Sequence, residues 1–142
     1  MNIYTGAGWA VLMLTNDHCD PHVHVEPKNQ EWYARFKFSF WHSGVNLWDV
    51  TPEKNSPTKK ILEKIRVAIE DPACLRKARE SWWNIQKKTC VENKFWDSVN
   101  LSICESAGQS TVFQIEKSSF DVSDYSTTLI IRGSNDVIKI EL

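Results

Sequence analysis

The sequence predicts an α+β protein with a mostly antiparallel sheet and two helices packed on one face of it. Alternating apolar and polar residues before residue 50 predict strands, apolar residues at helical spacing over 57–90 predict two helices, and alternation returns over 98–142. Because strands, helices and strands follow one another in blocks, antiparallel pairing is favoured over a parallel α/β sheet. The length of 142 residues suits a single domain over 1–142, with 95–142 as an alternative β-rich C-terminal subdomain.

The first block predicts three strands. An apolar run from Trp9 to Leu14 ends at a turn-forming Thr-Asn-Asp cluster, and valines alternate with polar residues over 22–26. Residues 31–41 alternate throughout, and a Pro-Lys-Asn-Gln turn over 27–30 predicts a hairpin between these last two strands. The side chains expected to face the core are Trp32, Ala34, Phe36, Phe38 and Phe40.

The middle block predicts two helices separated by Asp71-Pro72. Ile61, Leu62, Ile65 and Ile69 keep helical spacing in the first. Aspartate at the N-cap followed by proline at the first helical position is a start signal for the second helix, which we expect to end near Lys88. Its expected buried residues are Leu75, Ala78, Trp82 and Ile85.

The last block predicts short strands joined by turns. Val99, Leu101 and Ile103 alternate with polar residues, and residues 111–116 form another short strand after a Ser-Ala-Gly-Gln turn. Residues 127–132 and 137–142 predict a closing hairpin around the Gly-Ser-Asn-Asp sequence at 133–136.

Composition excludes several classes of protein. The net charge of −1 gives no global attraction to nucleic acid or anionic membranes, and 42% hydrophobic residues argue against disorder. The start lacks a basic segment followed by an apolar one, so we expect a cytoplasmic protein. The four cysteines are widely spaced and contain no Cys-x-x-Cys pair, so we expect reduced thiols and no thiolate zinc site.

The segment 17–26, Asp-His-Cys-Asp-Pro-His-Val-His-Val-Glu, holds three of the four histidines. On a strand, His22, His24 and Glu26 share one face and the valines take the other. Residues at alternate positions of a strand have Cα atoms about 6–7 Å apart, so their two imidazoles can converge on one metal ion, zinc in the first place. A third ligand would come from Glu26 or, from the preceding loop, His18 or Asp20. The alternative is a structural turn in which these polar groups bond the backbone around Pro21.

No complete catalytic set is visible, so the sequence favours a binding protein over an enzyme. Phosphate-binding glycine loops, nucleotide fingerprints and the nucleophile-elbow motif are absent. Cys19 beside His18 is a weak candidate nucleophile, because neighbours in a strand or turn need not face each other.

Tryptophan and basic residues suggest a partner surface. Seven tryptophans are present, and Trp41, Trp48 and Trp83 fall off the predicted buried faces, whereas the alternative is that all seven pack the core. Residues 53–94 hold eleven Lys and Arg against six Asp and Glu, a net charge of +5. These basic residues form either a solvated helical face or a surface that contacts an acidic protein or nucleic acid. The candidate contact residues are Trp41, Trp48, Trp83, Lys59, Lys60, Lys64, Arg76, Lys77 and Arg79.

The stretch from Gly8 to Val25, Gly-Trp-Ala-Val-Leu-Met-Leu-Thr-Asn-Asp-His-Cys-Asp-Pro-His-Val-His-Val, resembles the start of domain-of-unknown-function family 4160. These small bacterial proteins carry the signature Asp-His-x-Pro-Pro-His-x-His-Val and a later Trp-containing helix, which Trp82-Trp83 match. The resemblance covers about residues 7–88. The chain departs from it in having Asp20 in place of the first proline, a longer middle section and a β-rich tail.

The resemblance implies a setting rather than an activity. The family's activity is not established, and its members are often encoded beside small antitoxin-like partners, so no catalytic residue is carried over. We therefore expect a protein-interaction module of bacterial defence, toxin–antitoxin or mobile-element biology that binds another protein and no membrane. The alternatives are a phage-encoded inhibitor of a host defence complex, such as a CRISPR effector, and a metal-dependent nuclease built on the histidine cluster.

Overall fold

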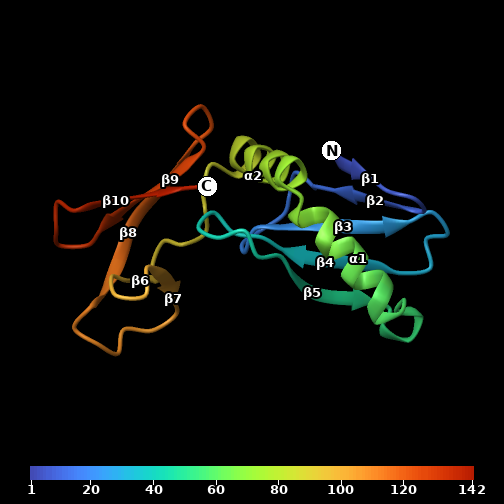
Figure 1. Cartoon of the computed structure of the whole chain (residues 1–142), viewed down its shortest axis with the longest axis horizontal. Helices are drawn as coiled ribbons and strands as arrows, with labels where there is room; N and C mark the ends of the chain where they lie inside the picture. The colour runs from blue at the N-terminus through green and yellow to red at the C-terminus, as the bar shows by residue number, and fades with distance from the viewer. The chain divides into compact units, whose positions relative to one another are not determined.

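The computed structural model describes residues 1–142, which divide into two compact units. The first unit comprises Met1–Ser39 and Ser43–Gln86, and the second comprises Phe40–His42 and Lys87–Leu142. Each unit has its own five-stranded antiparallel sheet, and both helices belong to the first (Figure 1). The predicted α+β class, with antiparallel sheets and two helices, is confirmed.

No helix of this chain is long and apolar enough to cross a membrane.

The sheet of the first unit is a meander in which every strand pairs with its neighbour in the chain. Its order is β1-β2-β3-β4-β5. The predicted hairpin between residues 22–26 and 31–41 is present, because β3 pairs β4 with Val25 opposite Ala34. Two further strands, β1 and β5, were not predicted, because neither has a clear alternation. The strands are β1 (Asn2–Thr5), β2 (Trp9–Leu12), β3 (His22–Pro27), β4 (Tyr33–Lys37) and β5 (Asn46–Thr51).

Two helices follow the sheet after a short 3₁₀ turn, η1 (Glu53–Asn55). Helix α1 (Lys59–Glu70) begins where the side chain of Thr58 accepts a hydrogen bond from the Ile61 backbone, an N-cap. Helix α2 (Pro72–Gln86) begins at the predicted proline, which needs no hydrogen-bond acceptor at that position. Figure 1 shows α1 crossing in front of the sheet and α2 near β1.

The two faces of the first sheet differ in chemistry. Four members of the predicted inward set on 32–40, Trp32, Ala34, Phe36 and Phe38, are buried in this unit together with Val11, Val23 and Val25. The fifth, Phe40, is also buried but belongs to the second unit, where its ring lies 5.1 Å from that of Phe120. The other face carries polar residues in register, with His24 opposite Arg35 and His22 opposite Lys37. Because paired residues of adjacent strands point to the same side, β3 and β4 gather these four side chains on one face.

The second unit is built from short strands and one long one. Its sheet order is β10-β9-β8-β6-β7, and the predicted closing hairpin is formed by β9 and β10. Its core consists of Val91, Trp96, Ile115, Leu129 and Ile131, with Trp41 packed against it. The strands are β6 (Phe95–Asp97), β7 (Ser102–Cys104), β8 (Val112–Asp121), β9 (Ser126–Ile131) and β10 (Val137–Glu141).

The predicted strand over 99–104 forms only in its second half. Val99 and Leu101 are exposed and lie in a turn, and only β7 remains of the strand. The cause is Asp97, whose carboxylate accepts hydrogen bonds from the backbone of Val99 and Asn100 and from the Asn100 side chain. An aspartate that caps a turn in this way competes with strand formation.

The expectation of four reduced thiols is also wrong. Cys19 and Cys90 are joined in a disulfide, while Cys74 and Cys104 are free. The spacing of 71 positions could not reveal this pairing, because folding alone decides which distant cysteines meet. Persistent disulfides are typical of oxidising compartments. The disulfide therefore gives no support to the expected cytoplasmic location, which stays a prediction.

Candidate metal centre

The loop between β2 and β3 places Asp17 at the end of the first sheet. The Leu14 backbone N–H donates a hydrogen bond to Asp17 Oδ2 at 3.2 Å, which closes the predicted Thr-Asn-Asp turn on its own side chain. Gln86, the last residue of α2, donates from Nε2 to the Asp17 carbonyl oxygen. A turn bond and a helix end therefore fix this residue from both sides.

Strand β3 presents His22 and His24 to the Asp17 carboxylate. The two imidazoles lie on one strand face with their ring centroids 5.0 Å apart. The Nε2 atoms of His22 and His24 are 3.4 and 2.8 Å from the same oxygen, Asp17 Oδ1. One possible ligand atom from each of the three residues lies within 4.8 Å of the other two. The side chains of His22, Asp17 and His24 are 1%, 8% and 24% exposed, so the cluster opens to solvent beside His24.

The protonation state of His22 follows from its other ring nitrogen. Its Nδ1 lies 2.7 Å from the backbone carbonyl oxygen of Asp20. A carbonyl oxygen only accepts, so Nδ1 carries the proton and donates it. In the neutral ring, Nε2 therefore presents a lone pair to Asp17 Oδ1. A backbone carbonyl that orients a histidine in this way is a regular partner of metal-bound imidazoles.

Burial favours the neutral form of His22. Desolvation lowers the pKa of His22 below its ordinary value, and this effect outweighs the hydrogen bond to Asp20 and the nearby Asp17 charge, which both raise it. At neutral pH, two lone pairs therefore face each other across 3.4 Å with no proton between them. Such an arrangement is stabilised by a cation bound between the two atoms.

The donor set fits a zinc ion. Metal–nitrogen and metal–oxygen bonds of about 2.0–2.2 Å in a tetrahedral site separate neighbouring ligand atoms by about 3.3 Å. The 3.4 Å between His22 and Asp17 matches this separation, and the 2.8 Å between His24 and Asp17 requires a small opening. At His24 the metal would replace the proton that Nε2 donates to Asp17. Two histidines and one carboxylate also suit non-haem iron.

Aromatic and cationic side chains surround the cluster. The ring of Trp48 meets His22 edge to face at 5.1 Å, and the ring of Trp82 lies 5.6 Å from it. The guanidinium of Arg35 and the ammonium of Lys37 lie 4.1 and 4.2 Å from the Trp48 ring centroid. These contacts hold His22 in place and bring two positive charges onto the same sheet face.

Carboxylates partly neutralise both cations. Arg35 binds Asp49 through two hydrogen bonds, which lower the pKa of Asp49. Lys37 makes a looser ion pair with Asp20, at 3.5 Å. Lys37 is therefore the cation that can turn toward an incoming anion at the lower cost.

The structure brings two of the five predicted metal ligands together, and the third member of the cluster, Asp17, was not among them. His18 is exposed, with its ring centroid 6.4 Å from that of His22. Asp20 contributes its backbone carbonyl to His22, and its carboxylate pairs with Lys37. Glu26 lies opposite Ala10 and is not a member of the cluster. The one sequence feature that pointed to Asp17 was its place in the turn before β3, and this did not determine its distance from the two histidines.

The predicted partner surface is divided among different environments. Trp41 packs against the core of the second unit, Trp48 lies over Arg35 and Lys37, and Trp83 is partly buried. Arg79 is buried and donates to the Ser39 carbonyl oxygen, so it is not part of an exposed basic surface. Arg76 pairs with Glu80. The exposed lysines are Lys59, Lys60, Lys64 and Lys77.

No protein-family model, no curated protein and no solved structure matches this chain. The resemblance to domain-of-unknown-function family 4160 therefore stays a prediction that depends on the motif around the histidines.

Proposed function

We propose that this protein binds a divalent metal ion, zinc in the first place, through Asp17, His22 and His24, and that the site hydrolyses phosphodiester bonds. The observation that carries the proposal is the convergence of the His22 and His24 Nε2 atoms on one oxygen of Asp17, at 3.4 and 2.8 Å, in a largely buried cluster. A purely structural hydrogen bond from His22 to Asp17 would need a proton on Nε2, and the bond from His22 to Asp20 has placed the proton on the other nitrogen.

The chemistry follows from the number of ligands. Three protein ligands leave a coordination position for water, as in catalytic zinc sites, and a metal-bound water ionises near neutral pH. The partial exposure of His24 gives that position access to solvent. Lys37, on the same sheet face, supplies a positive charge for a phosphate oxygen once it leaves its loose pair with Asp20.

The test is metal analysis of purified, untagged protein, followed by cleavage assays on single-stranded RNA and DNA with and without a chelator. We expect about one metal ion per chain, its loss in Asp17→Asn and His22→Ala, and its retention in Glu26→Gln. Cleavage should depend on the bound metal. A chain that holds no metal after incubation with zinc would leave Asp17 as a structural hydrogen-bond acceptor and overturn the proposal. Bound metal without cleavage would retain the site and reject the hydrolase.

A second candidate function is the interaction module of bacterial defence, toxin–antitoxin or mobile-element biology, including a phage-encoded inhibitor of a host defence complex. The observation that favours it is an apolar pocket, away from the metal centre, with an unpaired lysine at its rim. Retrieval of one stoichiometric partner from a cognate lysate, lost on mutation of that rim, is the expected result. A partner retained after such mutation would place the interaction elsewhere.

A further inference from the structure

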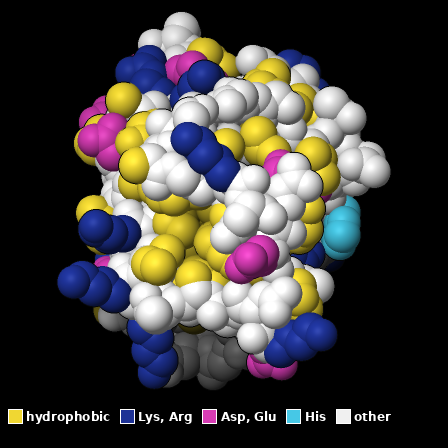
Figure 2. All heavy atoms as spheres, turned by 90° about the vertical axis from the view of Figure 1, so that its right-hand side faces the viewer, with side chains coloured by type: hydrophobic (Ala, Val, Ile, Leu, Met, Phe, Trp, Pro, Cys, Tyr) yellow, Lys and Arg dark blue, Asp and Glu magenta, His cyan; other side chains and the backbone are white.

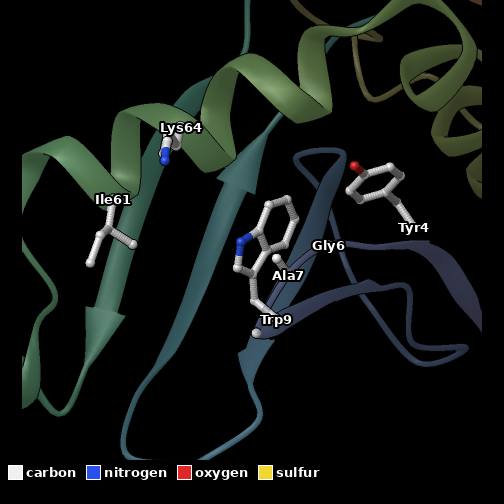
Figure 3. Close-up of a pocket in the computed structure, with 7 residues that line it drawn as sticks. Tyr4, Gly6, Ala7, Trp9, Ile61 and Lys64 are labelled. Carbon is white, nitrogen blue, oxygen red and sulfur yellow. The ribbon is translucent and has the colours of Figure 1, made fainter.

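A pocket of about 470 Å³ lies between the turn joining β1 to β2 and the exposed face of α1. Figure 3 shows the Trp9 indole and the Tyr4 ring on one side and Ile61 and Lys64 of α1 on the other. This volume lies within the range of small-ligand and side-chain pockets. None of its lining residues belongs to the metal centre.

Glycine at two positions makes the pocket possible. A Cβ atom at Gly6 would lie 2.6 Å from ring atoms of Trp9, so only glycine allows the indole to lie against the turn. The Gly6 N–H donates to the Trp9 carbonyl oxygen, and Gly8 has a positive φ of 95°. The Tyr4 and Trp9 rings lie 5.5 Å apart. The turn therefore holds two aromatic rings at the surface.

Exposed apolar and basic residues lie at the pocket and beside it on α1. Tyr4, Ile61 and Val67 are exposed, and Val67 lies on the α1 face that also carries Lys60 and Lys64. Figure 2, which looks onto this side of the first unit, shows hydrophobic side chains gathered in a hollow with Lys and Arg side chains around it. Exposed apolar residues rimmed by charges are typical of protein-binding sites.

Lys64 at this pocket and Lys60, one turn before it in α1, have no carboxylate partner. The acidic residues of α1, Glu63 and Glu70, are both bound by Arg66, and neither Lys60 nor Lys64 forms an ion pair. The ammonium of Lys64 lies beside apolar side chains, so the ligand that complements it carries an anionic group next to an apolar one.

We propose that this pocket binds an acidic segment of a partner protein, which inserts a bulky apolar side chain against Trp9 and pairs a neighbouring carboxylate with Lys64. This inference specifies the second candidate function and does not use the metal centre. A nucleic acid would be expected to contact a row of cations, whereas Lys64 is the one cation among the residues that line this pocket. A second copy of the chain would bring the same lysines face to face, because a two-fold interface uses the same patch twice.

Selection from a random peptide-display library against the full chain provides the test. We expect enriched sequences with an aromatic or branched apolar residue beside Asp or Glu. A synthetic peptide of the enriched sequence should bind Lys64→Glu about 10- to 100-fold more weakly than wild type, because a charge attraction becomes a repulsion. Ile61→Ser should weaken binding about 10-fold. The control Lys117→Glu makes the same charge change on the exposed face of β8 and should bind like wild type.

Several outcomes would overturn the inference. Enriched peptides without acidic residues, or binding equal in wild type and Lys64→Glu, would reject the pocket while leaving an interaction site elsewhere. Failure to enrich any peptide would reject it as well. Sedimentation that shows a dimer dissociated by Ile61→Lys would make a second copy the occupant. Binding of single-stranded RNA that competes with the peptide would make it a nucleic-acid contact. Circular dichroism of each variant separates loss of binding from loss of fold.

Discussion

Zinc is expected to raise the melting temperature of this protein by about 10 °C when present at one hundred times its dissociation constant. The proposed ligands come from a loop and a strand, Asp17 on one side and His22 and His24 on the other. Unfolding would separate them and release the ion. A ligand that binds only the folded state therefore adds its binding free energy to the free energy of unfolding.

The magnitude follows from the linkage relation. Ligand at one hundred times its dissociation constant adds about 2.7 kcal/mol. For a chain of 142 residues, about 1 kcal/mol shifts the melting temperature by about 4 °C. Asp17→Asn removes the charged ligand, while its amide oxygen still accepts a hydrogen bond from His24, whose Nε2 is 2.8 Å away. We therefore expect the metal-free variant to lose only about 1 kcal/mol and its response to zinc to disappear.

The assay is thermal unfolding followed by tryptophan fluorescence, in chelated protein with and without added zinc. Glu26→Gln is the matched control, because it alters a carboxylate on the same strand face outside the cluster. Its zinc response should equal that of the wild type. A melting temperature unchanged by zinc, or one raised equally in wild type and Asp17→Asn, would refute the assignment of these three residues as ligands.

Three further predictions concern other parts of the chain. With iodoacetamide at pH 8, Cys104 should be alkylated before Cys74, because burial raises the pKa of Cys74 to about 11, and the disulfide cysteines should react only after reduction; mass spectrometry checks the order. Gly6→Ala should displace Trp9, lower the free energy of unfolding by about 1–3 kcal/mol and shift the tryptophan fluorescence. The lowered pKa of Asp49 means that its ion pair stabilises above about pH 4 and that the stabilisation is lost as the pH falls through the folded pKa. Urea titration of Asp49→Asn should therefore show a loss of about 0.5–1 kcal/mol at pH 7 and a smaller loss at pH 2, and equal losses would contradict the pairing.

The sequence predicted the elements whose periodicity is strong. The alternation over 32–40 and the pair Ile65 and Ile69 of the predicted α1 stripe belong to elements that bury one face, so side-chain chemistry and structure repeat together. Ile61, at the start of that stripe, is exposed. Strand β5 was not predicted because its sequence has no such alternation. Its register against β4 shifts at a bulge between the pairs formed by Arg35 and Phe36. The turn at Asp97 was not predicted because the hydrogen bonds to its carboxylate stabilise a turn where the alternating pattern favours a strand.

The candidate metal centre was predicted in part for a related reason. His22 and His24 are two residues apart on a strand, so their common face follows from strand geometry. Asp17 is five residues before β3, in a loop whose path depends on a hydrogen bond to Leu14 and on the end of α2. Loop ligands are set by such tertiary contacts, which spacing in the sequence does not encode.

Burial bears most directly on whether the histidine segment is a turn or a site. A turn needs only local hydrogen bonds, and exposed polar residues provide them without loss of hydration. Here the His22 imidazole is 1% exposed and the Asp17 side chain 8%. Removing a carboxylate and an imidazole from water costs several kcal/mol unless both are well paired. The hydrogen bonds that Asp17 accepts from His24 and from the Leu14 backbone offset part of this cost, but the contact between His22 Nε2 and Asp17 is unfavourable while the ring is neutral. A bound cation would convert that contact from a repulsion into two bonds, which is why we favour a metal site over a structural turn.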